Sequence, residues 1–350
     1  MPNLHQLLKA MVEKGSSDLH ITTGSPPQLR IDGRLVPLKT PPLTPVETKQ
    51  LCYSILADAQ KHKFEEESEL DLSFGVKGLS RFRANMFMQR GAVAAAFRTI
   101  PFKILTFQEL GLPAIASELS KKPRGLVLIT GPTGSGKSTS QAAMVDLLNK
   151  TRPYHIITFE DPIEYIHKHQ LSIVDQRQVG DDTPTFAEGL RSAFREDPDV
   201  ILIGEMRDLD TISTALTIAE TGHLVLATLH TNDAPQAINR IVDSFMGAQQ
   251  QQIRVQLAGC LAGVIYQQLV PAVGGGRVAA FEVLIANVAV RSMIKEGKID
   301  QIRSVLQTGL REGSQTLERS LNQLLRAGVI TERDARGRSL YPNEIQVKPV

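Results

Sequence analysis

The sequence has little of what several classes of protein require. Its 350 residues include two cysteines and no tryptophan, and 39 Lys and Arg against 37 Asp and Glu leave a formal net charge of +2. Cys52 and Cys260 are too few for a four-cysteine zinc site, and they do not resemble the disulfide framework of a secreted domain. The balanced charge gives no support for a nucleic-acid partner, and we expect none.

Long apolar segments are also missing. No run reaches the roughly 18 apolar residues of a membrane-spanning helix, and the N-terminal stretch MPNLHQLLKAMVEKG is too polar for a signal peptide. We therefore expect a cytoplasmic protein that is peripheral to a membrane at most. At about 150 residues per domain, the length suggests two domains, with one large core as the alternative.

Residues 1–100 are predicted to form a small α+β domain. An amphipathic helix over residues 4–12 should end at Gly15, and DLHITT and LRIDGRLVPL are predicted as strands around an Asp32-Gly33 turn. Thr44-Pro45-Val46-Glu47 fits a helix capping box. LDLSFGV, SRFRANMFMQ and AVAAAFRTI are predicted as antiparallel strands, so the order of elements differs from a βαβ series.

Proline and glycine interrupt this pattern after Ile100, and we place a linker at residues 101–112. Residues 113–350 are predicted to form an α/β domain. Its apolar strands GLVLIT, HIITFE, VILIGE and HLVLATLH alternate with helical segments, which is typical of a parallel sheet covered on both faces. Beyond Asp233 the pattern is mainly helical, apart from a strand VAAFEVL. The polar run Gln249–Gln252 is predicted to be a solvated helix face.

The segment GLVLITGPTGSGKSTS carries the motif G-x-x-x-x-G-K-[ST] between an apolar strand and a helix. The glycines of such a loop let backbone N–H groups surround a polyphosphate at the positive end of the helix. Lys137 would neutralise the β- and γ-phosphates, and the Ser138 hydroxyl would bind Mg²⁺. ATP and Mg²⁺ are therefore the expected ligands. The loop residues expected to contact the nucleotide are Gly131, Pro132, Thr133, Gly134, Ser135, Gly136, Lys137, Ser138 and Thr139.

Hydrolysis also needs a carboxylate opposite the γ-phosphate. Glu205 follows the buried strand VILI, and the carboxyl end of a parallel strand faces the crevice in which such sheets bind ligands. Glu205 is predicted to complete the Mg²⁺ shell or to polarise the attacking water, with a surface acid as the alternative. Glu160 and Glu164 follow the strand HIITF, and their pattern leaves open whether they are catalytic or belong to a solvated turn.

Two histidines lie at the ends of the predicted strand HLVLATLH. His230, at its carboxyl end, is the better candidate to sense phosphate, and His223 is a candidate for a subunit contact. Their odd separation in sequence places them on opposite faces of a strand. A structural role is the alternative for both.

Together these segments resemble the secretion ATPase superfamily of type II secretion and type IV pilus motors, and most closely its pilus retraction (twitching motility, PilT-like) family. The phosphate loop GPTGSGKST, the acidic box ITFEDPIEYIH, the Walker B segment DPDVILIGEMRD and the histidine box TGHLVLATLHTNDA occur in the family order. The resemblance also includes SSDLHIT, GRLVPL, SRFRANMFMQRG and AAFRTIP, so it covers nearly the whole chain. Pilus assembly and type II secretion relatives carry further N-terminal domains and usually a four-cysteine motif. Since this chain is too short for those domains and has only two cysteines, the resemblance favours retraction.

The resemblance implies a PAS-like domain at residues 1–100 and a RecA-like P-loop ATPase domain at residues 113–350. It implies a homohexameric ring that hydrolyses ATP to drive pilus retraction at the cytoplasmic face of the inner membrane. An inner-membrane platform protein is the implied partner, and a paralogous retraction ATPase is a second candidate. Three arginines of the first domain are implied to reach the nucleotide, with cross-strand pairing on a solvated sheet face as the alternative. These are Arg81, Arg83 and Arg98.

One segment departs from the family pattern. Ala289–Glu296 reads AVRSMIKE where the retraction family has AIRNLIRE, and four of the eight positions match. This departure leaves open whether the chain is the principal motor or an accessory paralogue in a mixed motor. A conjugative secretion ATPase is a further alternative with the same ring plan. A RecA-type DNA motor is disfavoured by the balanced charge and the lack of tryptophan.

Overall fold

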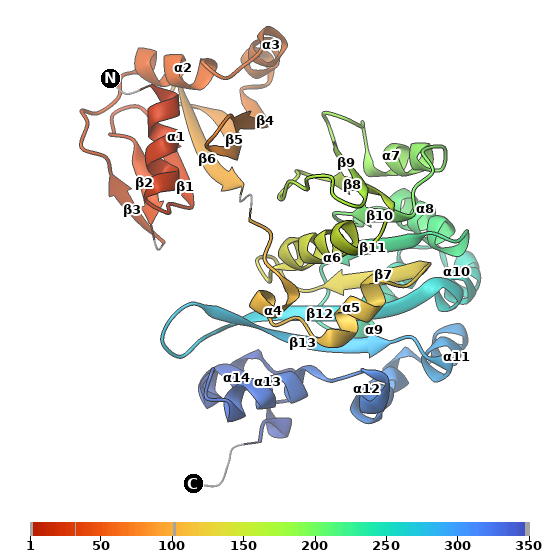
Figure 1. Cartoon of the computed structure of the whole chain (residues 1–350). Coiled ribbons are helices and arrows are strands. Elements are labelled where there is room, and N and C mark those ends of the chain that lie inside the picture. The colour runs from red at the N-terminus through yellow and green to blue at the C-terminus, as the bar shows by residue number, and fades with distance from the viewer. Residues whose placement is uncertain (1–2, 32, 101–102, 347–350) are drawn as a thin grey trace. The chain divides into compact units, whose positions relative to one another are not determined.

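The computed structural model describes residues 3–31, 33–100 and 103–346, and the chain divides into two compact units, residues 1–103 and 104–350 (Figure 1). The predicted linker at 101–112 falls at this division. Residues 101 and 102 of it lie outside the described residues. Its later part clusters with the second unit and includes the short helix α4 (Phe107–Leu110).

The first unit combines helices with one antiparallel sheet. Its elements are α1 (Leu4–Glu13), β1 (Asp18–Ile21), β2 (Gln28–Ile31), β3 (Arg34–Pro37), α2 (Pro45–Tyr53), α3 (Asp58–Glu67), β4 (Glu69–Val76), β5 (Ser80–Gln89) and β6 (Ala92–Ile100). The sheet order is β3-β2-β1-β6-β5-β4, with antiparallel neighbours throughout. The predicted helix and antiparallel strands of this domain are therefore confirmed.

Local sequence sets several boundaries in this unit. Thr44 and Glu47 form the predicted capping box at the start of α2. Gly33 has a φ of 80°, as a tight turn requires, while Asp32 of the predicted turn lies outside the described residues. Helix α3 was not predicted from the sequence, because Phe64 is its buried residue and the helix has no apolar period.

The second unit is larger and begins with α4 (Phe107–Leu110). Its further elements are α5 (Ala114–Ser120), β7 (Gly125–Thr130), α6 (Lys137–Thr151), β8 (His155–Glu160), β9 (Ile173–Gln178), α7 (Phe186–Ala193), β10 (Val200–Ile203), α8 (Leu209–Glu220), β11 (Leu224–Leu229), α9 (Ala234–Asp243), α10 (Gly247–Cys260), β12 (Leu261–Pro271), β13 (Arg277–Ile285), α11 (Val288–Glu296), α12 (Ile302–Thr308), α13 (Leu317–Arg326) and α14 (Glu332–Arg338). Short 3-10 turns lie at Ile299–Gln301, Gly309–Glu312 and Pro342–Glu344.

The second sheet has the order β13-β12-β7-β11-β10-β8-β9. The four predicted strands are β7, β8, β10 and β11, and they pair in parallel, which confirms the α/β fold class. Alternate residues of β7 face opposite layers: Val127 packs with α5 and α6, whereas Leu128 packs with α8 and α9. Helices therefore cover both faces of the sheet, and the apolar strands lie between them (Figure 1).

One prediction beyond Asp233 is wrong. The segment LAGVIYQQLVP lies in the region predicted to be mainly helical, but it forms the strand β12 next to β7. Its residues are buried on both faces, so the alternation that marks a strand is absent. The predicted strand VAAFEVL is confirmed as β13, and Gln249–Gln252 lies on α10 with mainly exposed side chains, as predicted.

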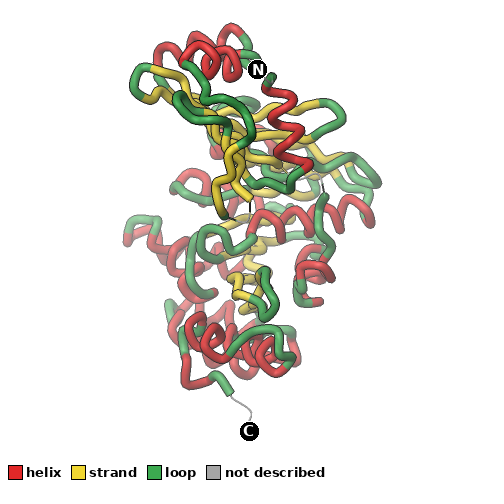
Figure 2. Tube along the Cα trace, turned by 90° about the vertical axis from the view of Figure 1, so that its left-hand side faces the viewer, coloured by secondary structure: helices red, strands yellow, loops and turns green. Residues whose placement is uncertain are grey.

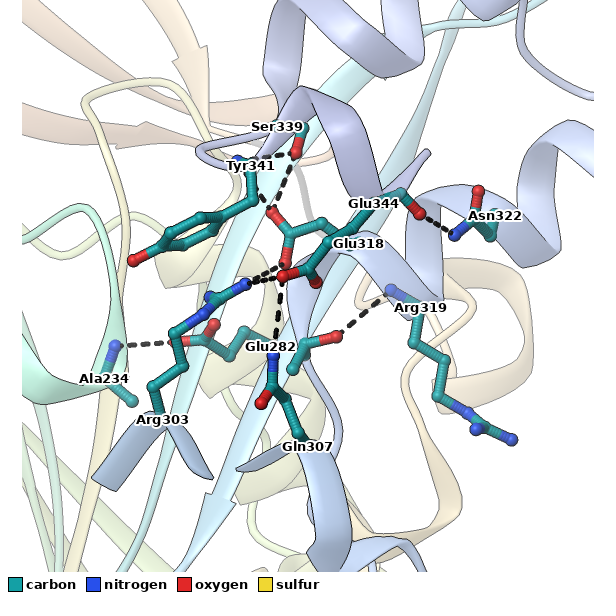
Figure 3. A network of polar contacts seen from close by, with 11 residues as sticks. Ala234, Glu282, Arg303, Gln307, Glu318, Arg319, Asn322, Ser339, Tyr341 and Glu344 are labelled. Carbon is teal, nitrogen blue, oxygen red and sulfur yellow. Dashed lines mark hydrogen bonds and ion pairs between the residues drawn. The ribbon is translucent and has the colours of Figure 1, made fainter. Parts of the chain in front are cut away.

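The C-terminal helices pack against the β12–β13 hairpin and gather near the C-terminus (Figure 2). A polar network lies among them (Figure 3). Arg303 donates to Glu344 over 2.7 Å, lies 3.7 Å from Glu318 and stacks 3.1 Å from the ring centroid of Tyr341. The buried Glu318 accepts a further hydrogen bond from the hydroxyl of Ser339 at 2.8 Å. Among the described residues, no helix is both long and apolar enough to cross a membrane.

Candidate functional site

The phosphate loop joins β7 to α6. Gly131, Gly134 and Gly136 have φ angles of 147°, 76° and 89°, which glycine adopts with little strain. Gly136 is the N-cap of α6, and no side chain caps this helix. The first N–H groups of α6 are therefore available to an anion at the positive end of the helix dipole. The loop has the geometry of an anion cradle.

Two loop side chains support this interpretation. Lys137 is only 8% exposed, and its Nζ donates to the carbonyls of Gly131 at 2.8 Å and Pro132 at 3.1 Å. Burial lowers the pKa of Lys137, and the charges of Glu205 and Glu164 partly oppose this shift. The Ser135 hydroxyl is buried without a hydrogen-bond partner in the described part of the chain. A phosphate group would supply acceptors at this point, so the residues fit a nucleotide.

The residues also fit Mg²⁺ bound together with a nucleotide. The described residues contain no group of three or more His, Cys, Asp and Glu placed to hold a metal by themselves. Mg²⁺ at a phosphate loop takes most of its ligands from phosphate oxygens and water, so a single protein hydroxyl is sufficient. Ser138 lies half-buried in the first turn of α6, where such a hydroxyl is needed.

Glu205 follows β10, and its carboxylate lies close to the side chains of Arg207 and His230. Its Oε2 lies 2.8 Å from Nη2 of Arg207, and its Oε1 lies 3.4 Å from Nε2 of His230. Burial by itself would raise the pKa of Glu205, but Arg207, His230 and Lys137 outweigh burial and lower the pKa. The Thr228 hydroxyl of β11 donates to the carbonyl of Gly204, which fixes the turn before Glu205. Glu205 is therefore a carboxylate at neutral pH.

The acidic box follows β8 and divides into two parts. Glu160 accepts hydrogen bonds from Thr158 at 2.6 Å and Gln176 at 3.1 Å, and burial raises its pKa in spite of these bonds. Glu164 is exposed, and its charge acts on Lys137. Asp161 lies 3.8 Å from Arg207. Glu160 is thus hydrogen-bonded to β8 and β9, whereas the charge of Glu164 acts on Lys137 of the phosphate loop.

The predicted residues of the second unit meet at one edge of the sheet. Gly131, Glu160, Glu205 and His230 each come at or just after the carboxyl end of β7, β8, β10 and β11, and these four strands are neighbours in the sheet. Ligands of open α/β sheets bind at this edge. His223 lies at the opposite end of β11, where its ring contacts Thr221 and packs edge-on against Phe194, with ring centroids 6.4 Å apart.

The predicted arginines of the first unit lie on one face of its sheet. Arg83 and Arg98 are directly opposite each other on β5 and β6, and Arg98 is opposite Asp18 on β1. Arg98 pairs with Asp18 at 2.8 Å, and Arg83 lies 3.7 Å from Asp71. Arg81, two residues before Arg83, donates to Ser73 at 2.8 Å. The cross-strand pairing considered as an alternative is therefore present, and Asp18 and Asp71 supply the opposite charges.

Three residues near the site were not identified from the sequence. Arg207 was inside a recognised segment, but its contact with Glu205 depends on the turn after β10. Tyr165 donates to or accepts from Thr139 at 2.8 Å, and Gln267 contacts the phosphate loop from β12. No local signal marks Gln267, because its partners are distant in sequence.

Comparison with known proteins identifies the family. The family model described as type II/IV secretion system protein matches residues 1–275 of this chain. The chain belongs to this family. It is 48% identical over 340 residues to the type IV pilus retraction ATPase PilT of Pseudomonas aeruginosa, covering 97% of this chain and 99% of that protein. It is 41% identical over 343 residues to the type IV pilus ATPase PilU of the same organism, covering 98% and 90%.

The fold of both units is also found in a solved structure. The crystal structure of the pilus retraction motor PilT with bound ADP matches with a TM-score of 0.93 and 52% sequence identity, covering 98% of this chain and 99% of that one. These matches confirm the prediction of a two-domain ATPase of the pilus retraction type.

Proposed function

We propose that this ATPase works as a homohexameric motor that couples Mg²⁺-dependent ATP hydrolysis to type IV pilus retraction. The observation that carries the proposal is the meeting of the phosphate loop, Glu205 and His230 at the carboxyl ends of neighbouring strands. The relative whose structure is described with bound ADP is similar over nearly the whole chain, which supports a nucleotide at this loop.

The site residues divide the work of hydrolysis. Lys137 and the N–H groups of α6 hold the β- and γ-phosphates, and Ser138 would hold Mg²⁺, which when bound would neutralise negative charge on the phosphates. The Glu205 carboxylate orients the attacking water or completes the Mg²⁺ shell through water. His230 contacts Glu205 and is placed to respond to the γ-phosphate. Glu164 is the stronger catalytic candidate of the acidic box, because the two hydrogen bonds of Glu160 commit it to the β8–β9 layer.

The PAS-like first unit supplies arginines to a nucleotide bound by a neighbouring subunit. Arg83 and Arg98 are opposite each other on β5 and β6, and a nucleotide phosphate would replace the carboxylates of Asp71 and Asp18 as their partner. This arrangement requires an oligomer, and the homohexamer is the oligomer that the family resemblance implies. The inner-membrane platform protein and a PilU-like paralogue are the proposed partners, at the cytoplasmic face of the inner membrane.

Steady-state ATPase activity against protein concentration, with particle mass measured by light scattering, tests the proposal. The variants are Glu205→Ala and, as a matched control, Glu118→Ala on α5, whose side chain is exposed. We expect activity to rise with hexamer formation, to collapse in Glu205→Ala and to persist in Glu118→Ala. A monomer without turnover would contradict the motor.

The accessory paralogue remains the second candidate, because AVRSMIKE differs from the family segment. Hexamers that bind ATP but turn it over negligibly would favour it. A deletion strain that loses twitching and keeps conjugation would exclude the conjugative ATPase.

A further inference from the structure

Gln267 of β12 lies where β7 passes into the phosphate loop. The two strands run in parallel, with Ile265 opposite Ile129 and Tyr266 opposite Thr130. The next residue, Gln267, therefore comes beside Gly131 at the start of the loop. Its side chain is 2% exposed. A buried amide must satisfy its donor and its acceptor within the protein, so its partners determine what it does.

Both ends of the Gln267 amide bind the phosphate-loop segment. Its Nε2 donates to the carbonyl of Ser135 in the loop at 2.7 Å, and its Oε1 accepts from the hydroxyl of Ser140 in the first turns of α6 at 2.7 Å. These two partners are on either side of Lys137 in sequence. A single planar amide thus ties the loop to the helix that follows it. Ser140 is itself buried, so both bonds are shielded from water.

The glycines of the loop are matched to Gln267. A Cβ on Gly131 would lie 2.2 Å from the backbone oxygen of Gln267, and a Cβ on Gly136 would lie 3.1 Å from its Nε2. By contrast, a Cβ on Gly134 would meet no atom within 4 Å. Two of the three loop glycines therefore leave room for Gln267 as well as adopting positive φ. The close approach of β12 to the loop therefore depends on glycine at positions 131 and 136.

We propose that Gln267 is a positioning residue of the nucleotide site, which holds the phosphate loop in its binding conformation through Ser135 and Ser140. The proposal deepens the proposed function, because it assumes that this loop binds nucleotide phosphates. Lys137 and the first N–H groups of α6 lie between the two anchor points. A shift of the loop by about 1 Å would misplace these donors together, and such errors are costly at a site of fixed geometry.

The neighbouring residue provides a matched control. Gln268 lies on the same strand, is 5% exposed and donates to the carbonyl of Arg338 at 2.7 Å. Because successive strand residues face opposite sides of a sheet, Gln268 points to the C-terminal helices and away from the loop. Replacing either glutamine by methionine keeps the side-chain length and removes the hydrogen bonds of the amide. The two variants therefore share a general cost in folding and differ in their effect on the loop.

The test is calorimetric titration of the full chain with ADP and Mg²⁺, together with melting temperatures without nucleotide. We expect Gln267→Met to bind ADP about tenfold or more weakly, as the loss of two buried hydrogen bonds predicts. Gln268→Met should melt at a similarly reduced temperature and bind ADP as the wild type does. Ser140→Ala, which removes one anchor without disturbing β12, should weaken ADP binding by a smaller factor. It also serves as the test variant if Gln267→Met does not fold.

Other outcomes separate the inference from the proposed function. If the wild type binds ADP and both Gln267→Met and Ser140→Ala bind it within about twofold of the wild type, Gln267 is only structural and the inference is overturned. The same conclusion follows if Gln268→Met weakens ADP binding as much as Gln267→Met does. A wild-type chain that binds no ADP would instead refute the proposed nucleotide site itself.

Discussion

Arg207 and Glu205 form an ion pair of 2.8 Å beside the phosphate loop. The pair keeps Glu205 ionised at a partly buried position, because burial alone would raise the pKa of this carboxyl group and Arg207 is the strongest influence against it. A residue that orients water for attack on phosphate must be ionised to do so. Arg207 thus extends the pH range in which Glu205 can act.

Arg207→Met should move the acid limb of the kcat–pH profile to higher pH. The pKa of Glu205 is lowered in the wild type, so its ionised form persists as the pH falls. When Arg207 is removed, Glu205 should become protonated at a higher pH. The measurement is kcat as a function of pH with saturating ATP and Mg²⁺. Arg336→Met removes an arginine paired with Glu332 on α14 and should leave the limb in place. An unchanged limb in Arg207→Met would show that Glu205 does not limit the rate.

Replacing Lys137 and replacing Ser138 should change the affinity for ATP in different ways. Lys137→Ala removes a charged donor from the phosphates and is expected to weaken ATP binding by roughly ten- to a hundredfold, with or without Mg²⁺. Ser138→Ala should bind ATP normally without Mg²⁺ and lose the gain in affinity that Mg²⁺ gives the wild type. Calorimetric titrations with ATP in EDTA and in Mg²⁺ distinguish the two. Equal losses under both conditions in Ser138→Ala would contradict its role as a metal ligand.

The parts of this site that are contiguous in the sequence could be predicted from it, whereas contacts between residues distant in sequence could not. The phosphate loop is one segment, and its glycines, Lys137 and Ser138 are recognisable without the fold. Gln267 is 132 residues from Ser135, and its strand β12 is buried on both faces, so neither spacing nor alternation marks it. The pairing of Glu205 with Arg207 and His230 likewise depends on turns after β10 and β11 that an apolar pattern does not specify.

Glu282 of β13 is expected to make stability depend on pH. Its buried carboxyl group accepts a hydrogen bond from the N–H of Ala234 at the start of α9 over 2.8 Å (Figure 3). Burial, with Asp233 and Glu318 nearby, raises the pKa of Glu282 from 4.5 to about 7, against the opposing influence of the Ala234 hydrogen bond and Arg303. The folded state thus binds a proton that the unfolded state releases, so this group lowers the free energy of unfolding as the pH rises from 4.5 to about 7.

Glu282→Gln keeps an acceptor for Ala234 and removes this titration. Relative to the wild type, the variant should gain stability between pH 5 and pH 8 by roughly 3 kcal/mol at most, the value of the full shift. Urea unfolding at the two pH values measures the difference. Glu188→Gln, which removes an exposed carboxyl group from α7, should not reproduce the gain. A constant difference between Glu282→Gln and wild type at both pH values would show that Glu282 does not titrate in this range.

Arg291 lies in the segment that departs from the retraction family, and it closes the end of α10. Its guanidinium donates to the carbonyls of Gly259 and Leu261, both at 2.7 Å, as well as to that of Ala258 and to that of Ala286 at 2.9 Å. The last carbonyls of a helix have no partners within the helix, and a cation there also favours the negative end of the dipole. Arg291 therefore anchors α11 to the junction of α10 and β12.

Arg291→Met should lower the free energy of unfolding by roughly 2–3 kcal/mol, because it leaves several carbonyls without donors. Arg291→Lys should recover only part of this loss, since an ammonium group cannot reproduce the planar fork that reaches carbonyls on both sides. Lys295→Met removes an exposed charge from the same helix and controls for net charge. If Arg291→Met unfolds at the same urea concentration as Lys295→Met, the anchor contributes nothing to stability. A loss of roughly 2–3 kcal/mol would instead confirm that Arg291 anchors α11 to the junction of α10 and β12.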